Sequence, residues 1–215
     1  MDYLMGIDIG STNLKAVIYD TAGHAVASAS RPTVRHNPDP EHPHWAIWKP
    51  EEIWDGIAAS IRETLGKIDS PEAVRGLCVT GMGMDGLPMT SSGEWLYPLI
   101  SWHCPRTAPQ HAWWVENIGA ERQFSISGTQ LWVFCSALRI LWMRENRPEI
   151  FDRTHKWVLI EDFINYMLCG EFATDYSMAS TTLLFDQKRR DWSDELLAAS
   201  GISREMLCDP KPAGT

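Results

Sequence analysis

Short apolar runs near the amino terminus are separated by small polar residues and predict a series of strands. Residues 4–9 (LMGIDI) and 14–19 (LKAVIY) flank residues 10–13 (GSTN), which predicts a strand, a tight turn and a second strand. Residues 24–30 alternate well enough to form a third, antiparallel strand. The proline- and histidine-rich residues 33–43 then predict a loop. Because prolines interrupt its histidines, a solvated loop is favoured there over a metal site.

The middle of the chain predicts one amphipathic helix and one strand. Pro50 stands where proline favours the first turn of a helix. Four aliphatic residues then recur at every fourth position and predict one buried stripe: Ile53, Ile57, Ile61 and Leu65. Residues 74–80 (VRGLCVT) predict a short buried strand, and the glycine-rich residues 81–86 (GMGMDG) follow it directly. In an open α/β sheet, the loop after the carboxyl end of a strand is where ligands usually bind.

The second half of the chain is predicted to be mostly helical. Helices are expected over residues 134–142, 161–168 and 194–200, and a hairpin over residues 87–89 and 95–99. Antiparallel strands, a helix, a strand and further helices follow one another in that order. This order predicts an α/β fold with a mixed sheet, whose first three strands are antiparallel and which helices flank.

The first turn has the composition of an anion site. A glycine and two small hydroxyl residues can bring backbone N–H groups against a phosphate, and Asp8 at the end of the preceding strand can hold a metal ion or its water shell. Together they indicate a Mg-nucleotide site. An ordinary hairpin with an acidic residue at its turn is the alternative that these residues leave open.

The surrounding pattern excludes two common nucleotide motifs. The G-x-x-x-x-G-K-[ST] spacing is absent, and a strand rather than a helix follows the turn. Strand-turn-strand phosphate sites of this kind resemble those of the ribonuclease-H-like folds, which include actin, the 70-kDa chaperones, hexokinases and the sugar kinases.

Charge and cysteine content narrow the class of partner. Nineteen basic and 28 acidic residues give a net charge of −9, which disfavours nucleic acid and anionic membranes as partners. The five cysteines are widely spread and form no C-x-x-C pair, so we expect reduced thiols in a cytoplasmic protein without a zinc site. No signal peptide or membrane span is expected. Eleven tryptophans favour a carbohydrate ligand slightly.

Four segments in series resemble the amino-terminal half of the FGGY family of carbohydrate kinases. They read GIDIGSTNLKAVIYD (6–20), HWAIWKPEEIWDGI (44–57), VRGLCVTGMGMDG (74–86) and GEWLYPLISWHCPRT (93–107). The resemblance continues weakly to the end of the chain. It implies a ribonuclease-H-like (actin-like ATPase) fold and the transfer of the γ-phosphoryl group of ATP, as its Mg²⁺ complex, to a sugar hydroxyl.

The same resemblance assigns roles to the hairpin. Asp8 would position the magnesium ion or its waters. The phosphate turn would consist of Gly10, Ser11, Thr12 and Asn13. Lys15 matches a basic residue that faces the phosphates, although a solvated lysine on a strand fits its position equally well.

Two further segments would hold the sugar. Met84 and Asp85 stand where many xylulose kinases read M-H-G and glycerol kinases an arginine-glutamate pair. Asp85 can accept hydrogen bonds from vicinal hydroxyls, or it can instead cap a backbone amide of the turn. Trp102 matches a tryptophan that forms an apolar wall of the sugar pocket. Arg106 would also bind substrate or, alternatively, anchor the loop by a salt bridge.

One departure from the family pattern bears on the substrate. The usual W-x-D-x-R reads Trp102-His103-Cys104-Pro105-Arg106, so a cysteine replaces the acid. Together with T-G-x-G-x-D-G, this string most resembles the L-fuculose kinases. His103 and Cys104 either shape the pocket or have a buried structural role. Xylulose, rhamnulose and glycerol kinases remain the alternative within the family.

The resemblance makes residues 1–215 the amino-terminal, sugar-binding domain, incomplete at its carboxyl end and without the carboxyl-terminal nucleotide domain. The general base, an aspartate in a G-x-D-x motif, is expected beyond Thr215, so no catalytic residue is assigned here. The intact protein is a possible homodimer. Two alternatives belong to other classes: a non-catalytic sugar-binding module and an actin- or chaperone-like ATPase.

We therefore expect the 215-residue chain to fold at least partly and to show no kinase activity, because general acid–base catalysis requires a base within reach of the sugar hydroxyl. A coupled assay of ADP release checks this. Sugar-dependent ADP release from the purified chain would contradict it.

Overall fold

The computed structural model describes residues 2–215 and divides into two compact units. The first unit runs to Arg35 and resumes from Trp48 to Met82, and the second consists of His36–Ile47 and Gly83–Thr215. Strand β4 (Ile47–Trp48) lies where the chain passes between them. Each unit is described by itself.

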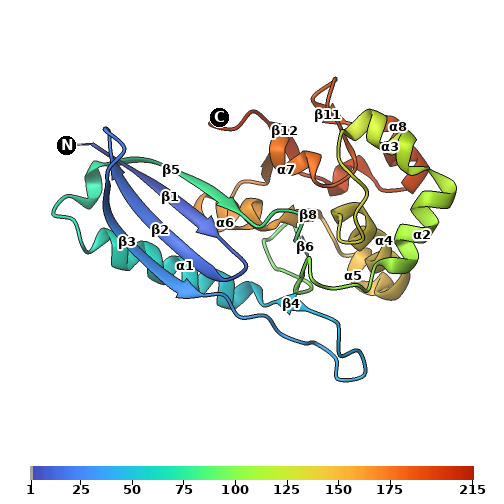
Figure 1. Cartoon of the computed structure of the whole chain (residues 1–215), viewed down its shortest axis with the longest axis horizontal. Helices are drawn as coiled ribbons and strands as arrows, with labels where there is room; N and C mark the ends of the chain where they lie inside the picture. Colours follow the sequence, from blue (N-terminus) through green and yellow to red (C-terminus); the bar gives the residue numbers. More distant parts are fainter. Residues whose placement is uncertain (1) are drawn as a thin grey trace. The chain divides into compact units, whose positions relative to one another are not determined.

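The first unit is a four-stranded sheet with one helix on one face (Figure 1). Its strands are β1 (Tyr3–Ile9), β2 (Asn13–Asp20), β3 (Ala25–Pro32) and β5 (Val74–Gly81), in the order β3-β2-β1-β5. The first three are antiparallel, and β5 is parallel to β1. The short 3₁₀ helix η1 (Pro71–Ala73) leads into β5. The mixed sheet predicted from the sequence is therefore confirmed.

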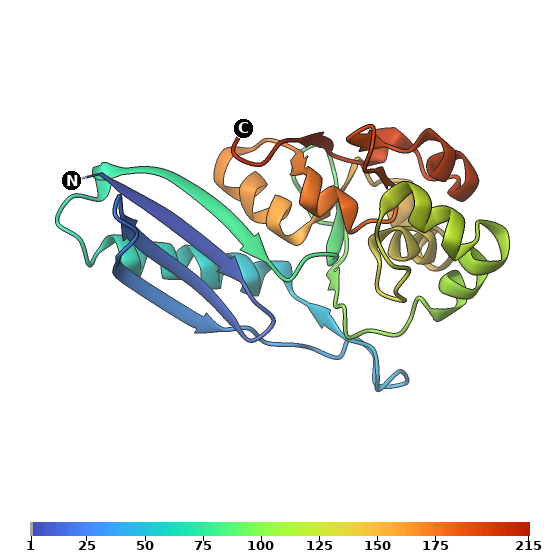
Figure 2. The same ribbon diagram turned by 45° about the horizontal axis from the view of Figure 1, so that its top comes forward.

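Helix α1 (Pro50–Leu65) covers the apolar face of this sheet (Figure 2). Alternate residues of β1 and β2 point toward it and are buried: Met5, Ile7, Ile9, Leu14, Ala16 and Ile18. Ile53 and Ile57 are buried as predicted, but Ile61 and Leu65 are only half-buried, and Ser60 and Thr64 are buried instead. The hydroxyl groups of Ser60 and Thr64 donate to the carbonyls of Gly56 and Ser60, at 2.9 and 2.8 Å. These bonds let the two polar residues face the sheet.

Strand β5 is an edge of the sheet, which the sequence did not indicate. We predicted a buried strand, but no residue of β5 is buried, and the side chain of Leu77 is 48% exposed. That prediction was wrong for this chain because β5 pairs with β1 on one side only.

The second unit combines short strands with most of the helices. Strand β6 (Gly86–Met89) pairs antiparallel with β8 (Lys156–Leu159). The predicted hairpin is also present, because Met89 and Trp95 form an antiparallel bridge. The amide of Thr90 donates to the carbonyl of Glu94 and the amide of Leu96 to the carbonyl of Pro88, both at 2.9 Å. Gly86 is required in β6 because a Cβ there would collide with the indole of Trp157.

The helices of the second unit surround an apolar core centred on α4 (Ser136–Asn146). Every residue from 136 to 143 is buried. The predicted helices correspond to α4, α6 (Ile160–Cys169) and α8 (Asp194–Ser200), with Gly170 and Gly201 in left-handed conformations after the last two. In α6, however, Leu168 is exposed, whereas Glu161 and Asp162 are buried.

The remaining elements of the second unit are short. They are β7 (Leu99–Ile100), α2 (Ala108–Asn117), α3 (Ala120–Ser127), α5 (Pro148–Phe151), β9 (Ala173–Asp175), α7 (Tyr176–Ser180), β10 (Phe185–Asp186), β11 (Asp191–Trp192), η2 (Arg204–Met206) and β12 (Asp209–Lys211). No helix within residues 2–215 is long and apolar enough to cross a membrane.

The burial of α1 predicts unequal effects of two matched substitutions. Ile57→Ala should lower the free energy of unfolding by about 2–5 kcal/mol, because it empties a fully buried site. Ile61→Ala removes the same atoms from a half-buried position and should cost clearly less. Urea unfolding followed by circular dichroism measures both, and equal losses would contradict the orientation of α1.

Candidate functional site

The hairpin of the first unit places Asp8 and Lys15 side by side. They are direct partners in the β1–β2 register, and both are exposed on the face that does not contact α1. An exposed carboxylate and an ammonium group therefore lie on neighbouring strands next to the turn. Mg²⁺ is commonly bound by one or two carboxylates together with phosphate oxygens and water. Asp8 and its neighbourhood fit a Mg-nucleotide on these grounds.

The turn between β1 and β2 is closed by backbone hydrogen bonds. The amide of Gly10 donates to the carbonyl of Asn13 at 3.0 Å, and a Cβ on Gly10 would lie 2.9 Å from that oxygen. Thr33 holds the turn by two hydrogen bonds. Its hydroxyl donates to Gly10 O at 2.7 Å, and its amide donates to Thr12 O at 2.9 Å. The amides of Ser11 and Thr12 donate to no group among residues 2–215. These two amides therefore have donor capacity for an anion.

No group of three or more His, Cys, Asp or Glu side chains gathers as metal ligands in the described part of the chain. Of the loop histidines, His42 pairs with Asp39 at 2.9 Å and stacks on Trp45. Any magnesium at Asp8 would therefore take its other ligands from phosphate and water.

In the second unit, residues 83–85 form a strained turn directly before β6. Gly83 and Met84 have φ values of 63° and 51°, and the amide of Asp85 donates to the carbonyl of Gly83. An i to i+2 hydrogen bond around a residue with positive φ is a γ-turn. This conformation is energetically unfavourable for Met84, because a residue with a Cβ disfavours positive φ. Such strain persists only where surrounding groups fix it, and it is concentrated at functional sites.

Groups from two helices fix this turn. The amide of Gly83 donates to Glu161 Oε1 at 3.0 Å, and the amide of Ile160 donates to the carbonyl of Asp85 at 2.8 Å. The carbonyl of Met84 accepts from Ser136 Oγ at 2.6 Å and from Arg139 Nη1 at 2.5 Å. Helices α4 and α6 therefore hold all three residues of the turn.

Asp85 and Arg139 form a buried ion pair. Asp85 Oδ1 lies 2.9 Å from Arg139 Nη2, and their side chains are 0% and 1% exposed. The sequence offered two roles for Asp85, as a sugar ligand or as a cap on a backbone amide, and did not indicate this partner. A sugar hydroxyl could reach Asp85 only if the groups that cover it move.

Two buried acids stand in the first turn of α6. Burial raises the pKa of Glu161 to about 7; the amide of Gly83 opposes this shift, and the charges of Asp85 and Asp175 add to it. Burial also raises the pKa of Asp162 well above its ordinary value. Glu161 Oε2 has no hydrogen-bond partner among the described residues, so ionised Glu161 is poorly compensated.

Trp102 is accessible. Its side chain is 37% exposed, its ring stacks on His103 at 3.7 Å, and it meets Phe134 edge-on at 6.2 Å. The structure therefore leaves the indole of Trp102 partly exposed and supports it by two further rings. His103 is held in turn by Ser101 Oγ, 3.0 Å from its Nδ1.

Arg106 is an anchor, but not through a salt bridge. The guanidinium is buried, 4.2 and 4.9 Å from the ring centroids of Trp45 and Trp142. Its Nη1 donates to the hydroxyl of Tyr97, and its Nε lies 3.0 Å from Cys104 Sγ. Within the described residues it has no carboxylate partner. Cys104 is thus buried against the arginine.

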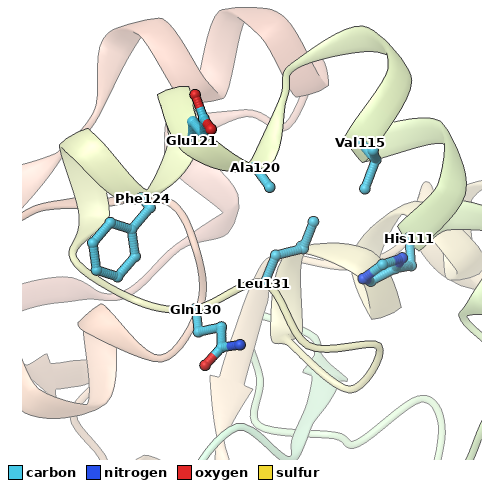
Figure 3. Close-up of a pocket in the computed structure, with 7 residues that line it drawn as sticks. All are labelled: His111, Val115, Ala120, Glu121, Phe124, Gln130 and Leu131. Atoms are coloured by element: carbon cyan, nitrogen blue, oxygen red, sulfur yellow. The ribbon is translucent and has the colours of Figure 1, made fainter.

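A separate depression of about 540 Å³ contains none of the predicted site residues (Figure 3). It is lined by His111, Val115, Ala120, Glu121, Phe124, Gln130 and Leu131. Four of its seven lining residues are apolar. The side chains of Val115 and Leu131 point into it. It offers no group that the predicted chemistry uses.

The sequence did not indicate Arg139, Glu161 or Phe134 as residues of the candidate site. A signal for Arg139 was present, because an arginine within the apolar run Ala137–Met143 requires a buried acceptor. Glu161 and Asp162 likewise precede an apolar run. The local sequence pattern does not show that these groups meet at residues 83–85. Arg139, for example, lies 54 positions after Asp85 in the chain.

Comparison with known proteins adds to this geometry. Residues 3–214 match the family model for the FGGY family of carbohydrate kinases, N-terminal domain. The L-fuculokinase of Escherichia coli (strain K12) is 35% identical over 96% of this chain and 43% of that protein. The xylulose kinase of Klebsiella pneumoniae is 32% identical over 94% of this chain and 41% of that protein.

A solved structure agrees with this match. The xylulose kinase from Rhodospirillum rubrum superposes with a TM-score of 0.90 at 26% identity, over 98% of this chain and 43% of that chain. The chain thus spans less than half the length of these relatives.

The burial of Glu161 predicts a pH-dependent effect of Glu161→Gln. Between pH 4.5 and about 7 the folded chain keeps a proton that the unfolded chain loses, so the free energy of unfolding falls by about 3 kcal/mol as the pH rises. Glutamine keeps the acceptor for Gly83 without this penalty. The variant should match the wild type near pH 4.5 and exceed it in stability at pH 8.

Urea unfolding at pH 4.5, 6 and 8 measures this difference. Glu171→Gln, which changes an exposed glutamate, is the matched control. A stability difference that does not grow with pH would contradict the placement of Glu161.

Proposed function

Because this chain belongs to the FGGY family of carbohydrate kinases, we propose that it is the sugar-binding part of an ATP-dependent kinase that phosphorylates a hydroxyl of a ketose such as L-fuculose. The observation that carries the proposal is the 35% identity to an L-fuculokinase over 96% of the chain. The exposed Trp102 and the fixed turn at residues 83–85 support it.

The hairpin of the first unit supplies the phosphate-binding groups in this proposal. Mg-ATP supplies the γ-phosphoryl group, whose transfer depends mainly on positioning and on neutralisation of charge. Asp8 holds the magnesium ion or its waters, while Lys15 and the amides of Ser11 and Thr12 face the phosphates. Gly10 and Asn13 keep these amides turned outward, because their backbone groups close the turn.

The second unit supplies the sugar side. Trp102 provides an apolar wall for the carbon-bound hydrogens of the sugar, and Met84 is a second apolar contact in this proposal. Once the groups that cover it move, Asp85 accepts hydroxyl hydrogen bonds through the acceptor sites that Arg139 leaves, since an ionised carboxylate has about four. Arg106 acts indirectly, by anchoring the loop that carries Trp102.

Other members of the same family set the alternatives. A xylulose, rhamnulose or glycerol kinase would use the same hairpin with a different sugar, and the 32% identity to a xylulose kinase supports that candidate next. A sugar-binding module without catalysis would keep Trp102 and the turn alone. Affinities for L-fuculose, L-rhamnulose, D-xylulose and glycerol, measured side by side, rank these candidates.

Trp102→Ala tests the sugar site directly. If Trp102 forms the wall, the substitution should weaken binding of the preferred ketose about tenfold or more, because stacking on an exposed aromatic face is lost. Trp113→Ala is the matched control, since Trp113 is also 37% exposed but lies on α2. Calorimetry on the purified chain measures both. Equal affinities for the two variants would contradict the assignment of Trp102.

A further inference from the structure

We propose that Arg139 is a positioning residue of the sugar site: it donates to the carbonyl of Met84 and pairs with the carboxylate of Asp85, and so fixes the turn that carries both residues. This inference rests on the proposed function, because it gives the turn a purpose in sugar binding.

Arg139 occupies an environment that demands acceptors. It stands in α4 between buried apolar residues, and none of its surface is exposed. A buried guanidinium is costly unless it is paired and hydrogen-bonded. Nη1 donates a hydrogen bond to Met84 O, whereas Nη2 is paired with Asp85 Oδ1 by charge, and these two partners belong to consecutive residues of the turn.

The shape of the guanidinium matters as well as its charge. Nη1 binds the backbone of Met84 at 2.5 Å while Nη2 lies 2.9 Å from the side chain of Asp85. One rigid, planar group therefore spans the strained residue and the carboxylate that follows it. A lysine carries the same charge on a single nitrogen and cannot reproduce this fork.

The other contacts of the turn reach its backbone. Ser136 shares the carbonyl of Met84, and Glu161 binds the amide of Gly83. Arg139 adds a contact to the Asp85 side chain, which is the group that would accept from a sugar. Loss of Arg139 would leave the strained turn with fewer restraints and Asp85 without its cation.

The charges around the turn make this cation important. Asp85 and Asp175 both raise the pKa of Glu161 by repulsion, although burial is the larger cause. Asp162 and Glu161 are neighbours at the start of α6. Without Arg139, the charge of Asp85 beside Glu161 would lose the cation that is paired with it, which favours opening of the turn.

Arg139→Met and Arg139→Lys test the proposal, and Arg144→Met is the matched control. Arg144 lies on the same helix but donates to the carbonyls of Ser200 and Gly201. Two quantities are measured on the 215-residue chain, after circular dichroism confirms that each variant is folded. They are ketose affinity by calorimetry and amide hydrogen exchange by NMR.

Arg139→Met should weaken ketose binding at least tenfold and speed exchange of the Gly83 and Asp85 amides at least tenfold. Exchange in the β6–β8 ladder should stay within twofold, which separates local opening from general destabilisation. Arg139→Lys should fall between Arg139→Met and the wild type, and Arg144→Met should stay within twofold of the wild type. If Arg139→Met does not fold, Arg139→Lys tests the proposal instead. It should weaken ketose binding and speed amide exchange of the turn at least threefold, and smaller changes in both would overturn the proposal.

A folded Arg139→Met chain with ketose affinity and turn exchange within twofold of the wild type would overturn the proposal. So would faster exchange in the turn and the ladder alike, because that indicates a structural role only. If the wild-type chain binds no ketose, the proposed function fails for this chain. The exchange measurement then still decides whether Arg139 fixes the turn.

Discussion

The buried ion pair between Asp85 and Arg139 is the interaction on which the second unit's candidate site depends. Removing one partner of such a pair typically costs about 3–5 kcal/mol, yet replacing both by apolar residues is often neutral. Stability alone therefore does not explain why a charged pair is found here. The pair joins α4 to a turn in which Met84 is strained. The pair has a more specific effect on the orientation of this turn than on stability, because the same guanidinium also donates to the backbone carbonyl of Met84.

The two candidate half-sites are built on different principles. In the first unit, the turn exposes backbone amides and the charged side chains of Asp8 and Lys15. In the second unit, the acids are buried and the accessible group is the indole of Trp102. Exposed amides and an ammonium group suit an anion, whereas an aromatic face suits a neutral, partly apolar sugar. The chemical contrast agrees with a division between phosphate and sugar recognition.

Local signals allowed much of the first unit to be predicted. The hairpin follows from two apolar runs around a small-residue turn, and the start of α1 follows from Pro50. The buried face of α1 was harder, because Ser60 and Thr64 read as polar but bond to backbone carbonyls of their own helix. The partner of β6 and the contacts of Arg139 were not predictable from pattern. They are set by pairings between distant segments, which neither periodicity nor propensity encodes.

Where the family pattern has an acid, this chain has Cys104, and Arg106 is held by other contacts. A buried arginine without a carboxylate partner needs other contacts that offset the desolvation cost of its charge. Arg106 lies over the faces of Trp45 and Trp142, whose π systems attract a cation, and Tyr97 accepts one of its hydrogen bonds. Two of the eleven tryptophans therefore contact this cation as well as packing in or against the apolar core. Since the loop remains anchored, the cysteine does not by itself argue against Trp102 as a wall of the sugar site.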